Sequence, residues 1–177
     1  GALSNEEFDA IYKARTDSMR SRFTPADVRF MSSMIHHHAQ AIEISQLAPS
    51  RATSPSIQTL AARIINAQRD EIALMQQWLR DRGQPVPEVH ITDSAVMLHG
   101  GDHDMHMPGM LTAEQVAQLR GARGAAFDRL FLHLMIQHHR GAVTMVHELF
   151  RTYGAGQDEA VFKFASDVQV DQSTEVA

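Results

Sequence analysis

An internal repeat restricts the fold of this chain more than any other feature of its sequence. The segment SMIHHHAQAIEI, residues 33–44, matches LMIQHHRGAVTM, residues 134–145, at a shift of 101 positions. The segments that follow match at a shift of 104 positions, which aligns two pairs of polar residues: Gln68 with Gln172 and Glu71 with Glu175. A helical hairpin cannot bury its apolar face alone. We therefore expect two hairpin copies to pack about a pseudo-twofold axis as a four-helix bundle.

Start and stop signals predict an all-α chain. Ser4 with Glu7 forms a capping box, Thr24 precedes Pro25 at a first helical position, and Thr112 begins a further helix. Gly83 is placed to end a helix. These signals predict helices over residues 4–22, 25–48, 55–82, 113–121 and 125–152, and a last one from about 158. The two shorter leading helices, 4–22 and 113–121, should lie outside the bundle.

The 177 residues suit one domain, residues 1–177, in which both copies share a core. The first copy covers residues 4–83 and the second covers 112–177. Residues 84–111 form a linker that is rich in methionine, histidine and turn-forming residues and has no helical period. The first copy continues past Glu71 to residue 83, whereas the second stops at Ala177, soon after the corresponding Glu175. We therefore expect the natural chain to continue.

The composition excludes several classes of protein. The chain has no cysteine, which excludes disulfides, zinc–thiolate sites and a cysteine nucleophile. A net charge of −5 gives no broad basic surface that would bind nucleic acid. No apolar run approaches the roughly 20 residues of a membrane span. The start at Gly1-Ala2 resembles a trimmed terminus, so we expect that an export signal has been removed.

The repeated helices place polar residues on their inward faces. Positions that alternate by three and four include Met34 and His37 in the first copy, and their counterparts in the second are Met135 and His138. The partner helices bring the repeated glutamine and glutamate to the same level. Burying such groups without partners costs about 1–3 kcal/mol each. They must therefore be hydrogen-bonded or bound to a ligand.

Two interpretations of this polar layer remain open. In the first it is a hydrogen-bonded core, in which Glu71 accepts from His37 and Glu175 accepts from His138. In the second, each copy presents a metal-binding face of one methionine and two adjacent histidines: Met34, His37 and His38, and Met135, His138 and His139. Four side chains would then orient the imidazoles: Gln68, Glu71, Gln172 and Glu175.

A dinuclear iron or manganese oxidase is a further alternative for a bundle that contains carboxylates and histidines. That class needs Glu-x-x-His, whereas this chain has Gln68-x-x-Glu71 and its repeat. Asp27 and Asp128 lie near helix starts, where a carboxylate is favoured as a cap. We expect both to cap helices rather than to bind metal, so the sequence disfavours an enzyme.

The linker carries a dense set of soft ligands: Met97, His99, His103, Met105, His106, Met107 and Met110. Thioether sulfur prefers Cu(I), and imidazole accepts either oxidation state of copper. A set of ligands without cysteine suits an oxidising compartment, where thiolates would be lost to disulfides. The linker therefore predicts a copper site, with zinc or nickel as the next candidates.

The doubled Met-Ile-x-His-His motif, at residues 34–38 and 135–139, resembles that of a bacterial family, domain-of-unknown-function family 305. The segments Phe127-Asp128, Gly109-Met110-Leu111-Thr112 and 167–177 resemble it as well. The resemblance implies a ferritin-like four-helix bundle. It also implies a role in periplasmic or secreted copper binding and copper tolerance.

The sequence thus predicts a metal-binding protein that sequesters or delivers copper, as Cu(I) or Cu(II), in the periplasm or outside the cell. Its partners would be the metal ion and, for delivery, another copper-handling protein, with no nucleic acid and no membrane span. The alternative is a structural or partner-binding bundle with a hydrogen-bonded core.

Overall fold

The computed structural model describes residues 3–20, 22–100 and 107–176, with their side chains except at 19, 20 and 174–176. The elements follow in chain order: α1 (Asn5–Arg20), α2 (Pro25–Ser45), α3 (Ala48–Arg51), α4 (Pro55–Asp81), β1 (Glu88–Ile91), β2 (Val96–His99), α5 (Ala113–Gly121), α6 (Gly124–Arg151) and α7 (Glu159–Val176). The predicted helical bundle is confirmed. Only a two-stranded sheet joins the helices in the described part of the chain.

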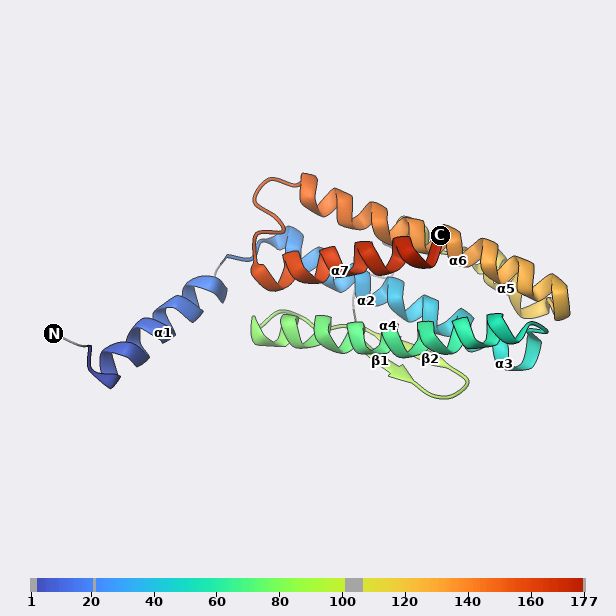
Figure 1. Ribbon diagram of the computed structural model, residues 1–177, viewed down its shortest axis with the longest axis horizontal. Coiled ribbons are helices and arrows are strands. Elements are labelled where there is room, and N and C mark those ends of the chain that lie inside the picture. The colour runs from blue at the N-terminus through green and yellow to red at the C-terminus, as the bar shows by residue number, and fades with distance from the viewer. Residues whose placement is uncertain (1–2, 21, 101–106, 177) are drawn as a thin grey trace.

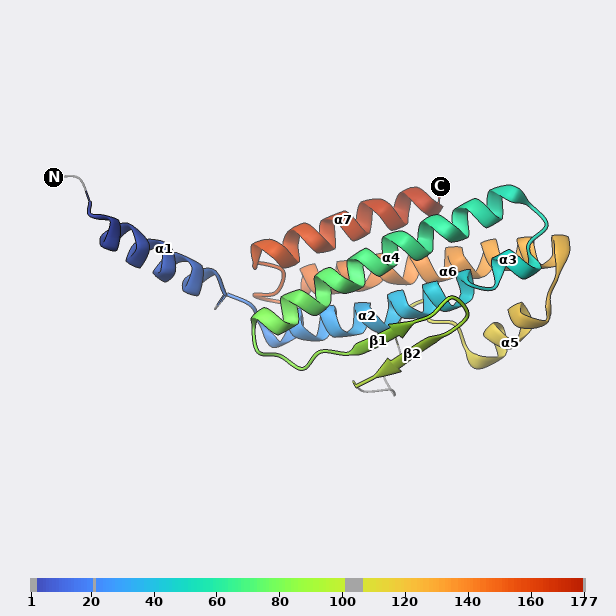
Figure 2. The ribbon, with the colours of Figure 1, turned by 90° about the horizontal axis from the view of Figure 1, so that it is seen from below.

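Four long helices run side by side (Figures 1 and 2). α2 packs on α4, α6 packs on α7, and contact between α2 and α6 joins the two pairs. The short helices α3 and α5 lie at one end of the bundle, and α1 projects away from the other (Figure 2). None of the helices in the described part of the chain combines the length and apolar character that a membrane crossing requires.

Helix caps form where the sequence predicts them. The Thr24 side chain accepts from the backbone N–H of Asp27, and the Asp27 carboxylate accepts from the backbone N–H of Thr24. Asp27 is buried and also accepts from the Gly156 N–H, at 2.7 Å, which ties the loop after α6 to the start of α2. Asp128 accepts from the backbone N–H groups of Thr53 and Ser54. Both aspartates therefore hold backbone groups at helix starts.

The linker contains an antiparallel β-hairpin that the sequence analysis did not predict. Residues 89, 91, 96 and 98 are apolar and pack against the core of the bundle, so the alternation of apolar and polar residues is that of a half-buried sheet. The hairpin lies along α2 (Figure 2). Its turn is closed by a hydrogen bond from Thr92 N–H to the Ala95 carbonyl, at 2.9 Å. Gln46, at the end of α2, donates to the Thr92 carbonyl at 2.6 Å.

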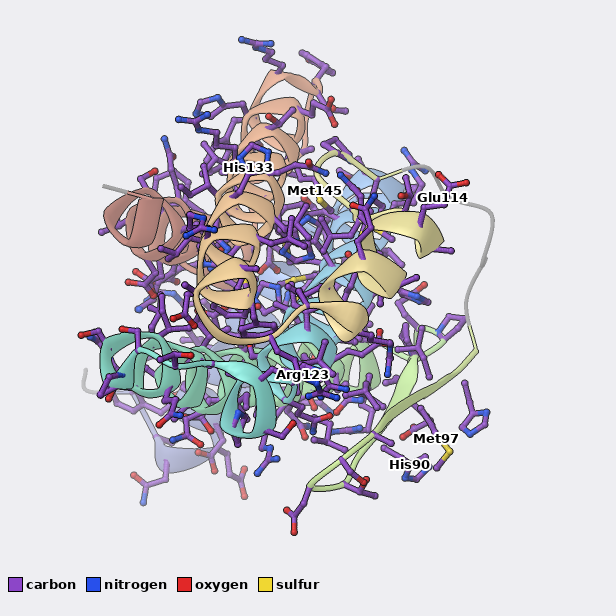
Figure 3. All side chains as sticks on the ribbon, turned by 90° about the vertical axis from the view of Figure 1, so that its right-hand side faces the viewer. His90, Met97, Glu114, Arg123, His133 and Met145 are labelled. Atoms are coloured by element: carbon purple, nitrogen blue, oxygen red, sulfur yellow. The ribbon has the colours of Figure 1, made fainter. Side chains whose placement is uncertain are left out.

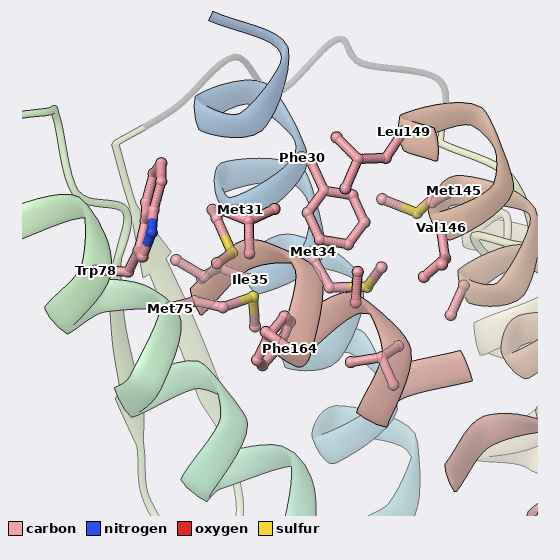
Figure 4. Packing of buried hydrophobic residues seen from close by; sticks show 14 of the residues in the cluster. Phe30, Met31, Met34, Ile35, Met75, Trp78, Met145, Val146, Leu149 and Phe164 are labelled. Carbon is pink, nitrogen blue, oxygen red and sulfur yellow. The ribbon is translucent and has the colours of Figure 1, made fainter. Parts of the chain in front are cut away.

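The buried apolar side chains form two clusters along the bundle. The first contains Met34, which lies close to Phe30 and Phe164 (Figure 4). The second contains Met135 together with Phe127 and other side chains from α2, α4, α5 and α6. The histidines of the repeated motif are buried along the same two helices, α2 and α6, that supply these methionines.

Candidate metal centre

Helices α2 and α6 bring the four repeated histidines into the interior. His37, His38, His138 and His139 are each at most 1% exposed. The rings of His37 and His138 are in contact in a tilted arrangement, with centroids 3.8 Å apart and planes inclined by 33°. The two copies of the motif therefore meet in one buried cluster instead of forming two separate faces.

The pairing predicted for the hydrogen-bonded core is wrong for His37. The Glu71 carboxylate binds Nε2 of His38, and Nε2 of His37 donates to the Pro108 carbonyl at 3.0 Å. α2 is buried nearly all round at this level, because α4 and the end of the linker cover different sides of it. His37 and His38 point about 100° apart on the helix. Each therefore meets a partner on a different side of α2.

His138 is the exception. Among the described residues, neither of its ring nitrogens has a hydrogen-bond partner, although the side chain is fully buried. Nδ1 of His38 likewise has none within the described part of the chain. Glu175 is the repeat counterpart of Glu71, but its side chain lies outside the described set. Gln68 and Gln172 are both buried, as the inward-face pattern predicts.

Burial keeps the rings of His37 and His138 neutral, because it lowers the pKa of both. Burial and, to a smaller extent, the neighbouring His38 lower the pKa of His37 to about 3, although its hydrogen bond to the Pro108 carbonyl opposes the shift. The pKa of His138 is lowered well below its usual value by burial first, and then by His37, His139 and His38, and an interaction with the His37 backbone partly opposes the shift. Neutral imidazole is the form that binds metal, so no proton has to leave these two rings at pH 7.

The end of the linker covers the cluster as a strap, residues 107–111. The strap crosses α6 so closely that a Cβ on Gly141 would lie 2.1 Å from the Pro108 carbonyl oxygen. A Cβ on Gly109 would lie 2.9 Å from the His138 carbonyl oxygen. On the α2 side, the Gln40 amide accepts from Leu111 N–H at 2.8 Å and donates to its carbonyl at 3.1 Å. Both helices therefore hold the strap in place.

The predicted methionine and linker ligands are distributed over several places. Met34 and Met135 lie in different apolar clusters, Met107 is buried in the first, and Met110 packs against it. His99 is exposed on β2. His103, Met105 and His106 lie outside the described residues. As the side chains stand, no three His, Asp or Glu residues in the described ranges are arranged to hold one ion.

Three features were not predicted from the sequence: the Pro108 carbonyl, the role of Gly141 and the exposed His90. The first two could have been found where the repeat breaks down, since position 141 is glycine and its counterpart 40 is glutamine. His90 could have been found from the alternating pattern of residues 88–91.

Known structures of the same fold include metal-bound proteins. A protein from Streptomyces coelicolor, described as a candidate secreted protein, is 25% identical, with 85% of this chain and 87% of that chain covered and a TM-score of 0.71. A fragment from Deinococcus radiodurans is 29% identical, with 87% and 92% covered and a TM-score of 0.70. CopM in its Cu(II)-bound form is 30% identical, with 85% and 90% covered and a TM-score of 0.65.

CopM has also been solved in Cu(I)-bound and silver-bound forms, at 27% and 29% identity. No curated protein sequence matches the chain. The Streptomyces and Deinococcus proteins are both described by the same family, DUF305. The profile of that family, a domain of unknown function, matches residues 27–177, and this chain therefore belongs to the DUF305 family.

Proposed function

We propose that this protein binds copper outside the cytoplasm, and that it sequesters the ion or passes it on without catalysing a reaction. The observation that carries the proposal is the state of His138. Its ring is fully buried, in contact with His37, and has no hydrogen-bond partner among the described residues. Burying two unpaired ring nitrogens is unfavourable. A neutral imidazole carries its lone pair on one of the two nitrogens, and a bound ion would satisfy that nitrogen.

The other imidazoles offer lone pairs to the same region. The Pro108 carbonyl can only accept, so the neutral ring of His37 carries its proton on Nε2 and leaves Nδ1 free of a proton. The Glu71 carboxylate favours the same tautomer in His38. For one ion to bind His138 and these nitrogens together, the rings of His37 and His138 have to rotate out of their present contact. Imidazole accepts both oxidation states of copper.

The relatives support copper as the ion. CopM binds Cu(I), Cu(II) and silver in a fold that this chain shares over most of its length. The absence of cysteine and the linker methionines suit an oxidising compartment. The Streptomyces relative is described as a candidate secreted protein. Together these features favour a periplasmic or secreted copper protein, with zinc as the next ion to test.

The test is an anaerobic titration of the metal-free protein with Cu(I) against a chromogenic chelator. We expect the double variant His37→Leu/His138→Leu to bind at least about tenfold more weakly, since losing only a ligand's hydrogen-bond partner costs about 10–100-fold. His133→Gln removes an exposed histidine from the same helix α6 and is the matched control. Unchanged affinity in the double variant would place the ion on the linker instead. No competition by the wild type would refute tight Cu(I) binding.

The hydrogen-bonded core is the second candidate, and the contacts of His38 with Glu71 and of His37 with Pro108 favour it. It predicts that removing His138 lowers stability and leaves metal affinity unchanged. The stability of a His138 variant therefore separates the two functions.

A further inference from the structure

All four outward positions of the β1–β2 hairpin carry side chains of metal-binding types. In the antiparallel register, Glu88 pairs with His99 and His90 pairs with Met97. These four side chains are exposed, and the residues that alternate with them are half-buried against the core. Met97 is 51% exposed, so its side chain contributes little to packing.

The geometry of this face suits a single ion. The rings of His90 and His99 lie diagonally across the two strands, with centroids 5.7 Å apart and planes inclined by 66°. Two imidazoles that bind one ion at about 2.0–2.1 Å place their ring centres roughly 5 to 6 Å apart. Met97 lies directly opposite His90, and directly paired side chains have Cβ atoms about 4.5–5.5 Å apart. Figure 3 shows His90 and Met97 next to each other and away from the helices.

We propose that His90, Met97 and His99 form a second, surface site for a soft monovalent ion, Cu(I). Two neutral imidazoles and one thioether match the preference of Cu(I) for soft, uncharged ligands. The carboxylate of Glu88, opposite His99, adds a negative charge beside the ion. The inference rests on the proposed function for the identity of the ion, but it does not require the buried histidines.

The hairpin holds these ligands in place before the ion arrives. Its inner face packs against the first apolar cluster, and a register shift of one residue would expose that face. The Thr92–Ala95 turn bonds and the Gln46 side chain fix the loop between the strands. Rigid support of this kind favours a specific site.

The position of the site indicates its use. The buried histidines lie beneath the 107–111 strap, whereas the hairpin face is open to solvent. An ion can therefore bind and leave the hairpin without displacing the strap. We infer that the hairpin exchanges Cu(I) with the medium or with another copper-handling protein.

The test is NMR of protein labelled with ¹³C at the methionine methyl groups, titrated with Ag(I) as a diamagnetic probe for Cu(I). The Met97→Leu variant assigns the Met97 signal and removes the sulfur at nearly constant volume. We expect the Met97 methyl signal to shift in the wild type and equally in His37→Leu/His138→Leu. The hairpin affinity should fall at least about tenfold in His90→Thr/His99→Thr, in which threonine preserves strand propensity. His133→Gln, on the far side of the molecule in Figure 3, should change nothing.

The outcomes separate this inference from the proposed function. A Met97 signal that stays fixed while other methionine signals move would overturn the hairpin site and leave the proposed function standing. A Met97 shift that disappears in His37→Leu/His138→Leu would overturn the independence of the two sites. If no signal moves and the chelator competition is also negative, both proposals fail.

Discussion

Replacing His138 with leucine should stabilise the metal-free protein. The histidine ring is fully buried and, among the described residues, both of its nitrogens lack partners. Each unpaired polar group costs about 1–3 kcal/mol, whereas leucine is apolar, similar in volume and a good helix former. The variant loses the ring contact with His37, which is worth about 0.5–1.5 kcal/mol. With the two nitrogens each taken at the lower end of that range, we expect a net gain of about 0.5–1.5 kcal/mol.

The measurement is urea unfolding with excess chelator, followed by circular dichroism. We expect a higher midpoint with an unchanged m-value, because the surface exposed on unfolding is nearly the same. His38→Leu is the matched comparison. It removes the partner of Glu71, whose side chain is only 15% exposed, and should lower stability by about 1–3 kcal/mol.

Copper should reverse the order of stability of the wild type and His138→Leu. An ion that binds only the folded wild type adds about 2.7 kcal/mol when its free concentration is 100 times the dissociation constant. The wild type should then unfold at a higher urea concentration than His138→Leu. If His138→Leu is less stable than the wild type without metal, the histidine nitrogens are satisfied in the folded protein, and the argument for a ligand role is refuted.

Three further predictions follow from the buried groups. The pKa of His37 is about 3 in the folded protein and about 6.5 in an unfolded chain, so the unfolded chain binds more protons below pH 6.5. Stability should therefore fall by up to about 1.4 kcal/mol per pH unit towards pH 3, and less steeply in His37→Leu. Urea midpoints measured between pH 7.5 and 5 test this. Gly141→Ala should lower the free energy of unfolding by at least about 1–3 kcal/mol, because its Cβ displaces the strap. Gly121→Ala is the control: its Cβ meets nothing within 4 Å, so it should be neutral or stabilising in the same assay. Asp27→Ala should lower the thermal midpoint by several degrees, because it removes a cap worth about 1 kcal/mol and leaves the Gly156 N–H without its acceptor.

The helical architecture could be predicted because its signals are local or repeated. Caps at Thr24 and Thr112 and the shift of 101 positions each depend on residues that can be read directly from the chain. The hairpin was missed for a different reason. Its strands are four residues long, and turn formers and soft ligands obscured the alternation between Val89 and Leu98.

The partners of the histidines could not be predicted, because the inward face of α2 was defined from one partner helix alone. In the structure the strap supplies a second set of contacts, so His38 meets Glu71 and His37 meets Pro108. Helical periodicity identifies which residues are buried. It does not identify which of two adjacent buried residues meets a given partner when the helix is covered on several sides.

The linker also breaks the symmetry of the repeat, and this explains why His37 and His138 differ. Position 40 in the first copy corresponds to position 141 in the second. Gln40 binds the backbone of the strap at Leu111, whereas Gly141 allows Pro108 and Gly109 to pass against α6. The strap crosses both helices once, so its Pro108 carbonyl accepts from His37, and no described carbonyl of the strap accepts from His138. The two copies of one motif therefore have different surroundings: His37 is held in place by the strap, and under the proposed function the lone-pair nitrogen of His138 is available to an ion.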